Sequence, residues 1–276
     1  MVSWFIVELH WRRTLVLYCI AYLSWQRRNA SLQKFQLKQL NNHYTYFLIL
    51  GCSLAGPLAL SFDKKVGFYK KWKYLFPAML LPAFFYIAWD IFFTAKNVWS
   101  FNANYITGIK IINLPVEEVL FFFVVPYCCV FIYECIRCYF PQLSNKRSVN
   151  IFMQLIAAVL LITGMIFYNR YYTSWAFILC ALFITKLYVF KKFFKNFNAA
   201  FFLVAYAIVL IPFLLINGFL TAIPVVLYND SENIGIRIYT IPLEDIFYGM
   251  LLIMMNIALY EKLKNRKIKT LVKQKV

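Results

Sequence analysis

The chain has 276 residues, of which 63% are hydrophobic and only 14% are charged. A water-facing surface normally needs about a quarter of its residues to be charged, so this composition excludes a soluble globular domain. The net charge of +18 comes from short Lys and Arg clusters between apolar runs, which argues against nucleic-acid binding and for signals of membrane topology. Seven cysteines lie mostly inside the apolar runs, where cysteine behaves as a small hydrophobic residue, so we expect neither disulfides nor a metal site.

Residues 1–42 differ from the rest of the chain. They contain six Lys and Arg residues, and their apolar stretch Thr14–Trp25 is too short to cross a membrane. We expect an N-terminal extension of unknown role. It is either a peripheral amphipathic segment or a leader translated from a start codon chosen too far upstream.

Seven apolar segments follow in chain order, and crossing a hydrocarbon core takes roughly 20 residues. They are Tyr44–Phe62, Tyr74–Ala95, Val116–Tyr139, Ile151–Tyr168, Tyr172–Phe190, Ala199–Ala222 and Leu243–Tyr260. Four of them contain a proline, which membrane helices tolerate as a kink because neighbouring helices satisfy the freed carbonyl groups. The sequence therefore predicts an all-α membrane protein with about seven transmembrane helices.

Lys and Arg residues are concentrated in the loops after the first, third and fifth segments and in the C-terminal tail 265–276. The remaining loops contain few basic residues. By the positive-inside rule the basic loops are cytoplasmic. We therefore expect an integral membrane protein, of the bacterial inner membrane, with its C-terminus in the cytoplasm.

An internal repeat relates two stretches of the chain at a constant offset of 127 positions. The matched pairs are Phe92 and Phe219, Thr94 and Thr221, Asn102 and Asn229, Gly108 and Gly235, Pro115 and Pro242, Glu117 and Glu244, Glu118 and Asp245, Tyr133 and Tyr260, and Glu134 and Glu261. Four membrane crossings separate the two units, so both point the same way through the bilayer. The repeat predicts two parallel three-helix units, residues 43–140 and 171–264, joined by a linker helix in residues 141–170.

Each unit carries a proline followed two and three positions later by acidic residues. Proline and early acidic residues are common at an ordinary helix start, so each motif alone has a structural explanation. The motif nevertheless occurs twice at one depth, close to a further acid at the end of the second segment, and ionisable groups inside membranes are costly enough to suggest function. We expect five carboxyl groups to converge near the non-cytoplasmic side: Asp90, Glu117, Glu118, Glu244 and Asp245.

Glu134 and Glu261 also repeat, but they lie at the cytoplasmic ends of their segments. Arg137 and Lys264 follow them at i+3 spacing, so we interpret both acids as members of surface ion pairs.

The motifs closely resemble the small integral-membrane lycopene cyclases. In the first unit the resemblance lies in Trp89-Asp90, Trp99-Ser-Phe101, Asn113-Leu-Pro-Val-Glu-Glu and Tyr133-Glu134, and in the second in Asn217 and Tyr239-Thr-Ile-Pro-Leu-Glu-Asp-Ile-Phe-Tyr248. It covers about Tyr44 to Lys264. The resemblance implies conversion of an acyclic C40 carotene within the bilayer into a product with ionone rings, most often lycopene to β-carotene. The two units differ at one important position, where Asp90 is matched by Asn217.

Cyclisation of a ψ end group needs a proton on C2, attack of the 5,6 double bond on the C1 cation and loss of a proton from C6. One acid and one base suffice, and the resemblance assigns these roles to Glu117, Glu118, Glu244 and Asp245, with Asp90 beside them. Aromatic residues near the motifs would stabilise carbocations, although packing explains them equally well. The predicted substrate-binding residues are Phe121, Phe122, Phe247, Tyr248, Trp99 and Asn217. The eight glycines include no dinucleotide-binding fingerprint, so we expect no cofactor.

Two other functions stay open. A membrane prenyltransferase would need Asp-rich motifs to bind magnesium and diphosphate, and only Asn229, Asp230 and Glu232 come close to one. A small proton-coupled transporter would also use parallel repeats with carboxyl groups inside the membrane. The sequence does not distinguish β from ε or γ rings, acid from base among the carboxyl groups, one cyclised end from two, or one oligomeric state from another.

Overall fold

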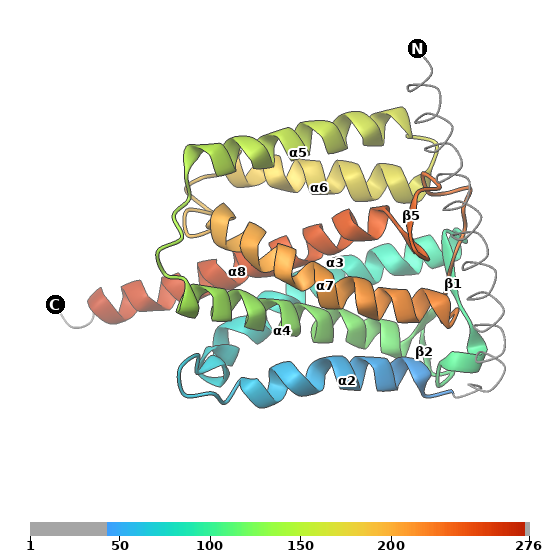
Figure 1. The fold of residues 1–276 in the computed structure, drawn as a ribbon, viewed down its shortest axis with the longest axis horizontal. Coiled ribbons are helices and arrows are strands. Elements are labelled where there is room, and N and C mark those ends of the chain that lie inside the picture. The colour runs from blue at the N-terminus through green and yellow to red at the C-terminus, as the bar shows by residue number, and fades with distance from the viewer. Residues whose placement is uncertain (1–42, 274–276) are drawn as a thin grey trace, which may run out of the picture. The chain divides into compact units, whose positions relative to one another are not determined.

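Seven α-helices make up most of the part of the chain that the structure describes. The structure is a computed structural model that describes the backbone of residues 43–273 and the side chains of residues 43–265. The predictions for residues 1–42 lie outside this part. The helices are α2 (Thr45–Leu60), α3 (Trp72–Ala95), α4 (Val116–Tyr139), α5 (Arg147–Ile166), α6 (Tyr171–Val189), α7 (Ala199–Ala222) and α8 (Glu244–Lys273). They lie side by side (Figure 1), which confirms the predicted all-α fold.

Helices α3 to α8 are long and apolar enough to cross a membrane, and α2 is a shorter apolar helix of 16 residues. Large apolar side chains on the outward faces are exposed, among them Phe84 at 74% and Ile211 at 66%. An apolar surface of this kind is stable against lipid rather than water. The predicted ends match to the residue for α4 and α7, whereas α8 continues beyond the predicted Tyr260.

The helices form two matching sets. Helix α2 packs on α4 as α6 packs on α8, and α3 packs on α8 as α7 packs on α4. If each helix is replaced by its repeat equivalent, α2 by α6, α3 by α7 and α4 by α8, each contact becomes its matching contact in the other set. A pseudo-two-fold axis requires this correspondence. Helix α5 lies between the sets in sequence and packs chiefly on α6, so the fold consists of two parallel three-helix repeats and a linker helix.

Two short β-hairpins precede the helices that carry the acidic motifs. The first pairs β2 (Lys110–Ile111) with β3 (Leu114–Pro115), and the second pairs β5 (Arg237–Ile238) with β6 (Ile241–Pro242). Gly108 and Gly235 lie just before the hairpins in the left-handed region, with φ of 84° and 83°, which favours glycine. All the strands lie at one end of the helices, opposite the C-terminal end of α8 (Figure 1).

A third strand pairing joins the two repeats. Strands β1 (Trp99–Phe101) and β4 (Val226–Tyr228) are antiparallel, and Ser100 pairs with its own repeat equivalent, Leu227. The hydrogen bonds on either side of the ribbon are repeat equivalents too. The Asn102 N–H donates to the Val225 oxygen and the Asn229 N–H donates to the Val98 oxygen, both at 2.9 Å. The pseudo-two-fold axis therefore passes through this two-stranded ribbon, and the two loops lie at the same end of the bundle.

A buried ion cluster joins α4 and α8 at the end opposite the strands. Glu134 and Glu261 are only 2% and 3% exposed, so the prediction of surface ion pairs was wrong. Arg137 does contact Glu134, at 3.3 Å, but it also bonds to Glu261 of the other repeat. Lys264 pairs with Glu134 at 2.6 Å rather than with its helix neighbour. Buried carboxylates need cations nearby, and the crossing of α4 and α8 supplies them from both repeats.

Candidate functional site

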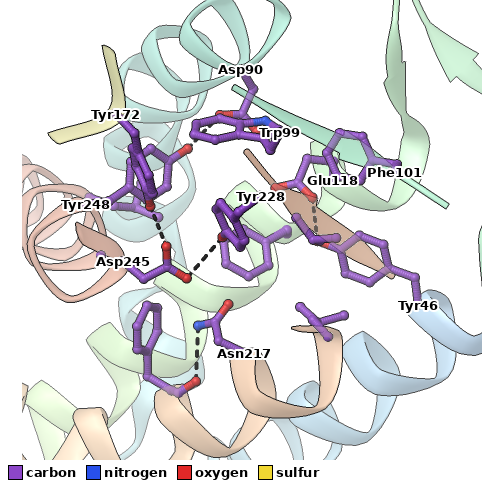
Figure 2. A pocket seen from close by; sticks show the side chains of 16 residues that line it. Tyr46, Asp90, Trp99, Phe101, Glu118, Tyr172, Asn217, Tyr228, Asp245 and Tyr248 are labelled. Carbon is purple, nitrogen blue, oxygen red and sulfur yellow. Dashed lines mark hydrogen bonds between the residues drawn. The ribbon is translucent and has the colours of Figure 1, made fainter. Parts of the chain in front are cut away.

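A small cavity of about 40 Å³ lies on the pseudo-two-fold axis, bounded by β1 and β4 (Figure 2). Both repeats contribute to its wall. It is lined by Tyr46, Asp90, Trp99, Phe101, Glu118, Phe121, Tyr172, Phe213, Asn217, Leu220, Val226, Tyr228, Asp245, Tyr248, Gly249 and Leu252. Several of these residues are repeat equivalents, such as Glu118 and Asp245, so the two repeats form one shared cavity here.

Three of the five predicted carboxyl groups meet at this cavity. Asp90 comes from the last two turns of α3, Glu118 from the first turn of α4 and Asp245 from the first turn of α8. They are 2%, 8% and 3% exposed. Carboxyl groups buried to this extent among apolar helices are costly unless they have hydrogen-bond partners, and all three do.

Two phenol groups donate hydrogen bonds to the carboxyl group of Asp245. The Tyr172 hydroxyl donates to Oδ1 at 2.5 Å, and the Tyr228 hydroxyl donates to Oδ2 at 3.0 Å. Both bonds are drawn in Figure 2. Each oxygen of this carboxyl group therefore has its own donor.

Asp90 and Glu118 form the second carboxyl arrangement. The Tyr248 hydroxyl donates to Asp90 Oδ1 at 2.7 Å, and the Tyr46 hydroxyl donates to Glu118 Oε2 at 2.6 Å. Both carboxyl groups line the cavity. Asn217, the repeat equivalent of Asp90, lines the same cavity, but its amide donates to the Phe213 carbonyl oxygen at 3.1 Å.

Glu117 and Glu244 are fully buried but do not line the cavity. Glu117 Oε1 accepts a hydrogen bond from the Thr107 N–H, and Glu244 Oε1 accepts one from the Ile234 N–H, both at 2.7 Å. The Oε2 atom of each is buried and has no hydrogen-bond partner among the described residues. These two acids therefore fix the loops that precede the hairpins.

Of the predicted aromatic residues, some line the cavity and others pack outside it. Trp99, Phe121 and Tyr248 line the cavity. Phe122 instead packs its ring on Phe121, with 5.6 Å between ring centroids, and Phe247 packs on Phe177 at 5.1 Å.

Helix periodicity explains which residues reach the cavity. Positions three or four apart lie on one side of a helix, whereas adjacent positions point about 100° apart. In α4 the cavity is lined by Glu118 and Phe121, and in α8 by Asp245, Tyr248, Gly249 and Leu252.

Sequence reasoning missed three tyrosines that bond to the carboxyl groups. Tyr46 and Tyr172 lie near the start of α2 and α6, and Tyr228 ends β4. Their hydroxyl groups lie at the same end of the bundle as the acids to which they bond. Buried tyrosines usually need a hydrogen-bond partner, so tyrosines at this depth were an available signal.

The residues that the structure describes include no group of three or more His, Cys, Asp or Glu side chains suited to a metal ion. The polar and aromatic side chains that line the cavity offer chiefly carboxyl, phenol and aromatic groups.

Comparison with known proteins identifies a matching family. The family model described as lycopene cyclase matches residues 43–136 and 169–263, two segments that contain both acidic motifs. Two relatives named lycopene beta-cyclase, from two strains of Halobacterium salinarum, are each 38% identical over 60 residues. That match covers 19% of this chain and 25% of each relative. No solved structure matches the chain.

Proposed function

Since the chain belongs to the lycopene cyclase family, we propose that it cyclises the ψ end groups of lycopene to ionone rings, with β-carotene as its main product. The observation that carries this proposal is the cavity shared by the two repeats. Three carboxyl groups and several aromatic rings line it, inside a bundle whose outer surface is apolar.

The reaction is an isomerisation that needs only proton transfer. A proton added to C2 leaves a cation at C1, the 5,6 double bond forms the C1–C6 bond, and the resulting C5 cation loses a proton from a neighbouring carbon. No electron is gained or lost overall. A carboxylic acid and a carboxylate suffice for the two transfers, and Asp90, Glu118 and Asp245 supply carboxyl groups within one cavity.

The cationic intermediates would meet aromatic rings in the cavity. Trp99, Phe121 and Tyr248 line it, and each favourable cation–ring contact is worth roughly 0.5–2 kcal/mol. The indole and phenyl rings stabilise positive charge without presenting a strong nucleophile that would trap it.

A C40 chain is far too large for the cavity alone, because a buried cavity of about 150 Å³ is needed for benzene. A second hollow of about 800 Å³ lies between α3, α6 and α8, and its lining includes Leu81, Leu182 and Met255. Phe85 lines this groove and packs on Trp89, which in turn packs on Tyr248 of the cavity wall. We place the polyene chain in the groove and the reacting end group in the cavity. The end group would enter the cavity when the rings of Phe85, Trp89 and Tyr248, which separate the two spaces, move aside.

The prenyltransferase alternative gains no support from the loop that suggested it. Asp230 has 69% of its side chain exposed and bonds to Arg237. The hydrogen bond from Arg237 lowers the pKa of this carboxyl group below its usual value. Glu232 accepts a hydrogen bond from the Tyr171 N–H at 3.0 Å. These acids are engaged in loop contacts outside the cavity and do not form a diphosphate site.

Expression in a lycopene-accumulating bacterial host, followed by pigment chromatography, tests the proposal. We expect cyclic carotenes to replace lycopene. When membranes from these cells convert unlabelled lycopene in heavy water, each new ring should carry one deuterium on C2. The matched control is the same chain with Asp90→Asn, Glu118→Gln and Asp245→Asn together. Unchanged lycopene with the wild-type chain present in the membrane would refute the proposed function.

A further inference from the structure

The two sides of the cavity differ although they come from equivalent repeats. On one side, Asp245 accepts a phenol hydrogen bond on each oxygen, from Tyr172 and from Tyr228. Hydrogen bonds donated to a carboxylate stabilise its charged form. Burial, together with the nearby charge of Asp245, raises the pKa of the Tyr228 phenol well above its usual value. Tyr228 therefore keeps its proton and stays a donor.

On the other side, Asp90 and Glu118 of the same repeat both line the cavity, and each has one phenol donor. Two neighbouring buried carboxyl groups repel each other strongly if both are charged, so such a pair retains a proton. Asp245 has no such partner in its own repeat, because the position equivalent to Asp90 is Asn217. An amide cannot share an acidic proton in this way.

We propose that the Asp90 and Glu118 pair donates the proton to C2, and that Asp245 accepts the proton that leaves the ring and thereby selects the ring isomer. Tyr172 and Tyr228 are positioning residues that fix this acceptor. The inference rests on the proposed function and divides its two proton transfers between the two repeats.

The chemistry links the position of the acceptor to the product. After the C1–C6 bond forms, the cation at C5 is bordered by C6, by C4 and by a methyl group. Loss of a proton from C6 gives the β ring, loss from C4 the ε ring and loss from the methyl group the γ ring. One proton enters from the acid pair and one leaves to Asp245, so the formula of the carotene does not change. Between turnovers the carboxyl groups exchange protons with solvent, which returns the pair to its protonated form and Asp245 to its charged form.

Product analysis separates the acceptor from the donor. We expect Tyr172→Phe and Tyr228→Phe to raise the ratio of ε and γ rings to β rings roughly tenfold, the size expected for losing one hydrogen bond to a charged group. Asp245→Glu should change the ratio in the same direction, because it moves the accepting carboxyl group by one methylene. Tyr46→Phe acts on the donor side, so it should lower total ring formation while the isomer ratio stays as in the wild type.

The matched control is Tyr127→Phe. It also removes a buried phenol, which bonds to Ser61 at 2.6 Å, but this residue does not line the cavity. It should change neither the total nor the ratio. Each variant is compared at equal amounts of protein in the membrane, determined by immunoblot.

Two results would overturn the inference. One is an unchanged isomer ratio in Asp245→Glu and in both acceptor-side Phe variants while rings still form. The other is a ratio that changes only in Tyr46→Phe, since this would exchange the two roles. A wild-type chain that forms no rings at all would instead refute the proposed function, so the two failures are distinguishable.

Discussion

At the scale of single residues, adjacent carboxyl groups in one helical turn have different surroundings. Glu118 lines the cavity, whereas Glu117 bonds to the loop backbone at Thr107. Asp245 and Glu244 repeat this division in α8. Successive helical residues are about 100° apart around the axis, so the side chains of two neighbours point in different directions.

This division predicts unequal effects of two similar substitutions. Glu118→Gln should reduce ring formation by roughly 10²-fold or more, as expected when a general acid is lost. Glu117→Gln should cost clearly less, because the amide oxygen of Gln can still accept the hydrogen bond from the Thr107 N–H. The measurement is cyclic carotene formed per amount of membrane protein. A larger loss from Glu117→Gln than from Glu118→Gln would place the proton transfer at Glu117 instead.

The sequence predicted the candidate carboxyl groups but not their partners. The constant repeat offset and the cost of charge in lipid singled out five acids, and three of them line the cavity. Tyr46 bonds to a residue 72 positions away, and Tyr172 bonds to one 73 positions away. Contacts between residues so far apart in the sequence depend on how the helices pack, and a single sequence does not specify that packing.

At the scale of elements, the groove between α3, α6 and α8 leads to a prediction with a close control. Leu81 lines the groove and Leu80 does not, although both are 61% exposed on the same helix. Leu81→Trp should lower the conversion of lycopene several-fold, because the indole fills space proposed for the polyene chain. Leu80→Trp should leave conversion near the wild-type level. Equal conversion by the two variants would exclude the groove as the site of the chain.

The helices were predictable because each apolar run has the length that a membrane crossing needs. The strands were not, because pieces of two or three residues are too short to show an alternating pattern. The ion cluster was predicted only in part. Spacing along one helix correctly paired Arg137 with Glu134, but the contact between α4 and α8 adds a carboxylate from the other repeat.

At the scale of the whole molecule, neither repeat lines the cavity alone. The first repeat supplies the acid pair of Asp90 and Glu118, and the second supplies Asp245 with Tyr172 and Tyr228. The internal repeat was visible in the sequence, and it correctly predicted two parallel units. That the axis runs through paired strands, with the cavity beside them, could not be predicted, because the pairing joins segments 127 positions apart.

A divided chain should therefore work only when both parts are present. The connection between α4 and α5 allows a break between Leu143 and Ser144, outside every helix. We expect residues 1–143 or 144–276 alone to form no rings, and the two parts expressed together to restore cyclisation. Pigment chromatography in the lycopene-accumulating host measures the outcome. Ring formation by either part alone would contradict a cavity shared between the repeats.

The pairing of β1 with β4 also bears on how such a molecule could arise. A strand that pairs with its own equivalent about a two-fold axis makes an isologous contact, the kind that joins identical subunits. A single three-helix unit could use the same hydrogen bonds to associate with a second copy of itself. In such a homodimer, any substitution would appear on both sides of the axis at once. Joining the units in one chain removes that constraint, and it allows Asp90 to face Asn217 where a symmetric ancestor would have carried two identical residues.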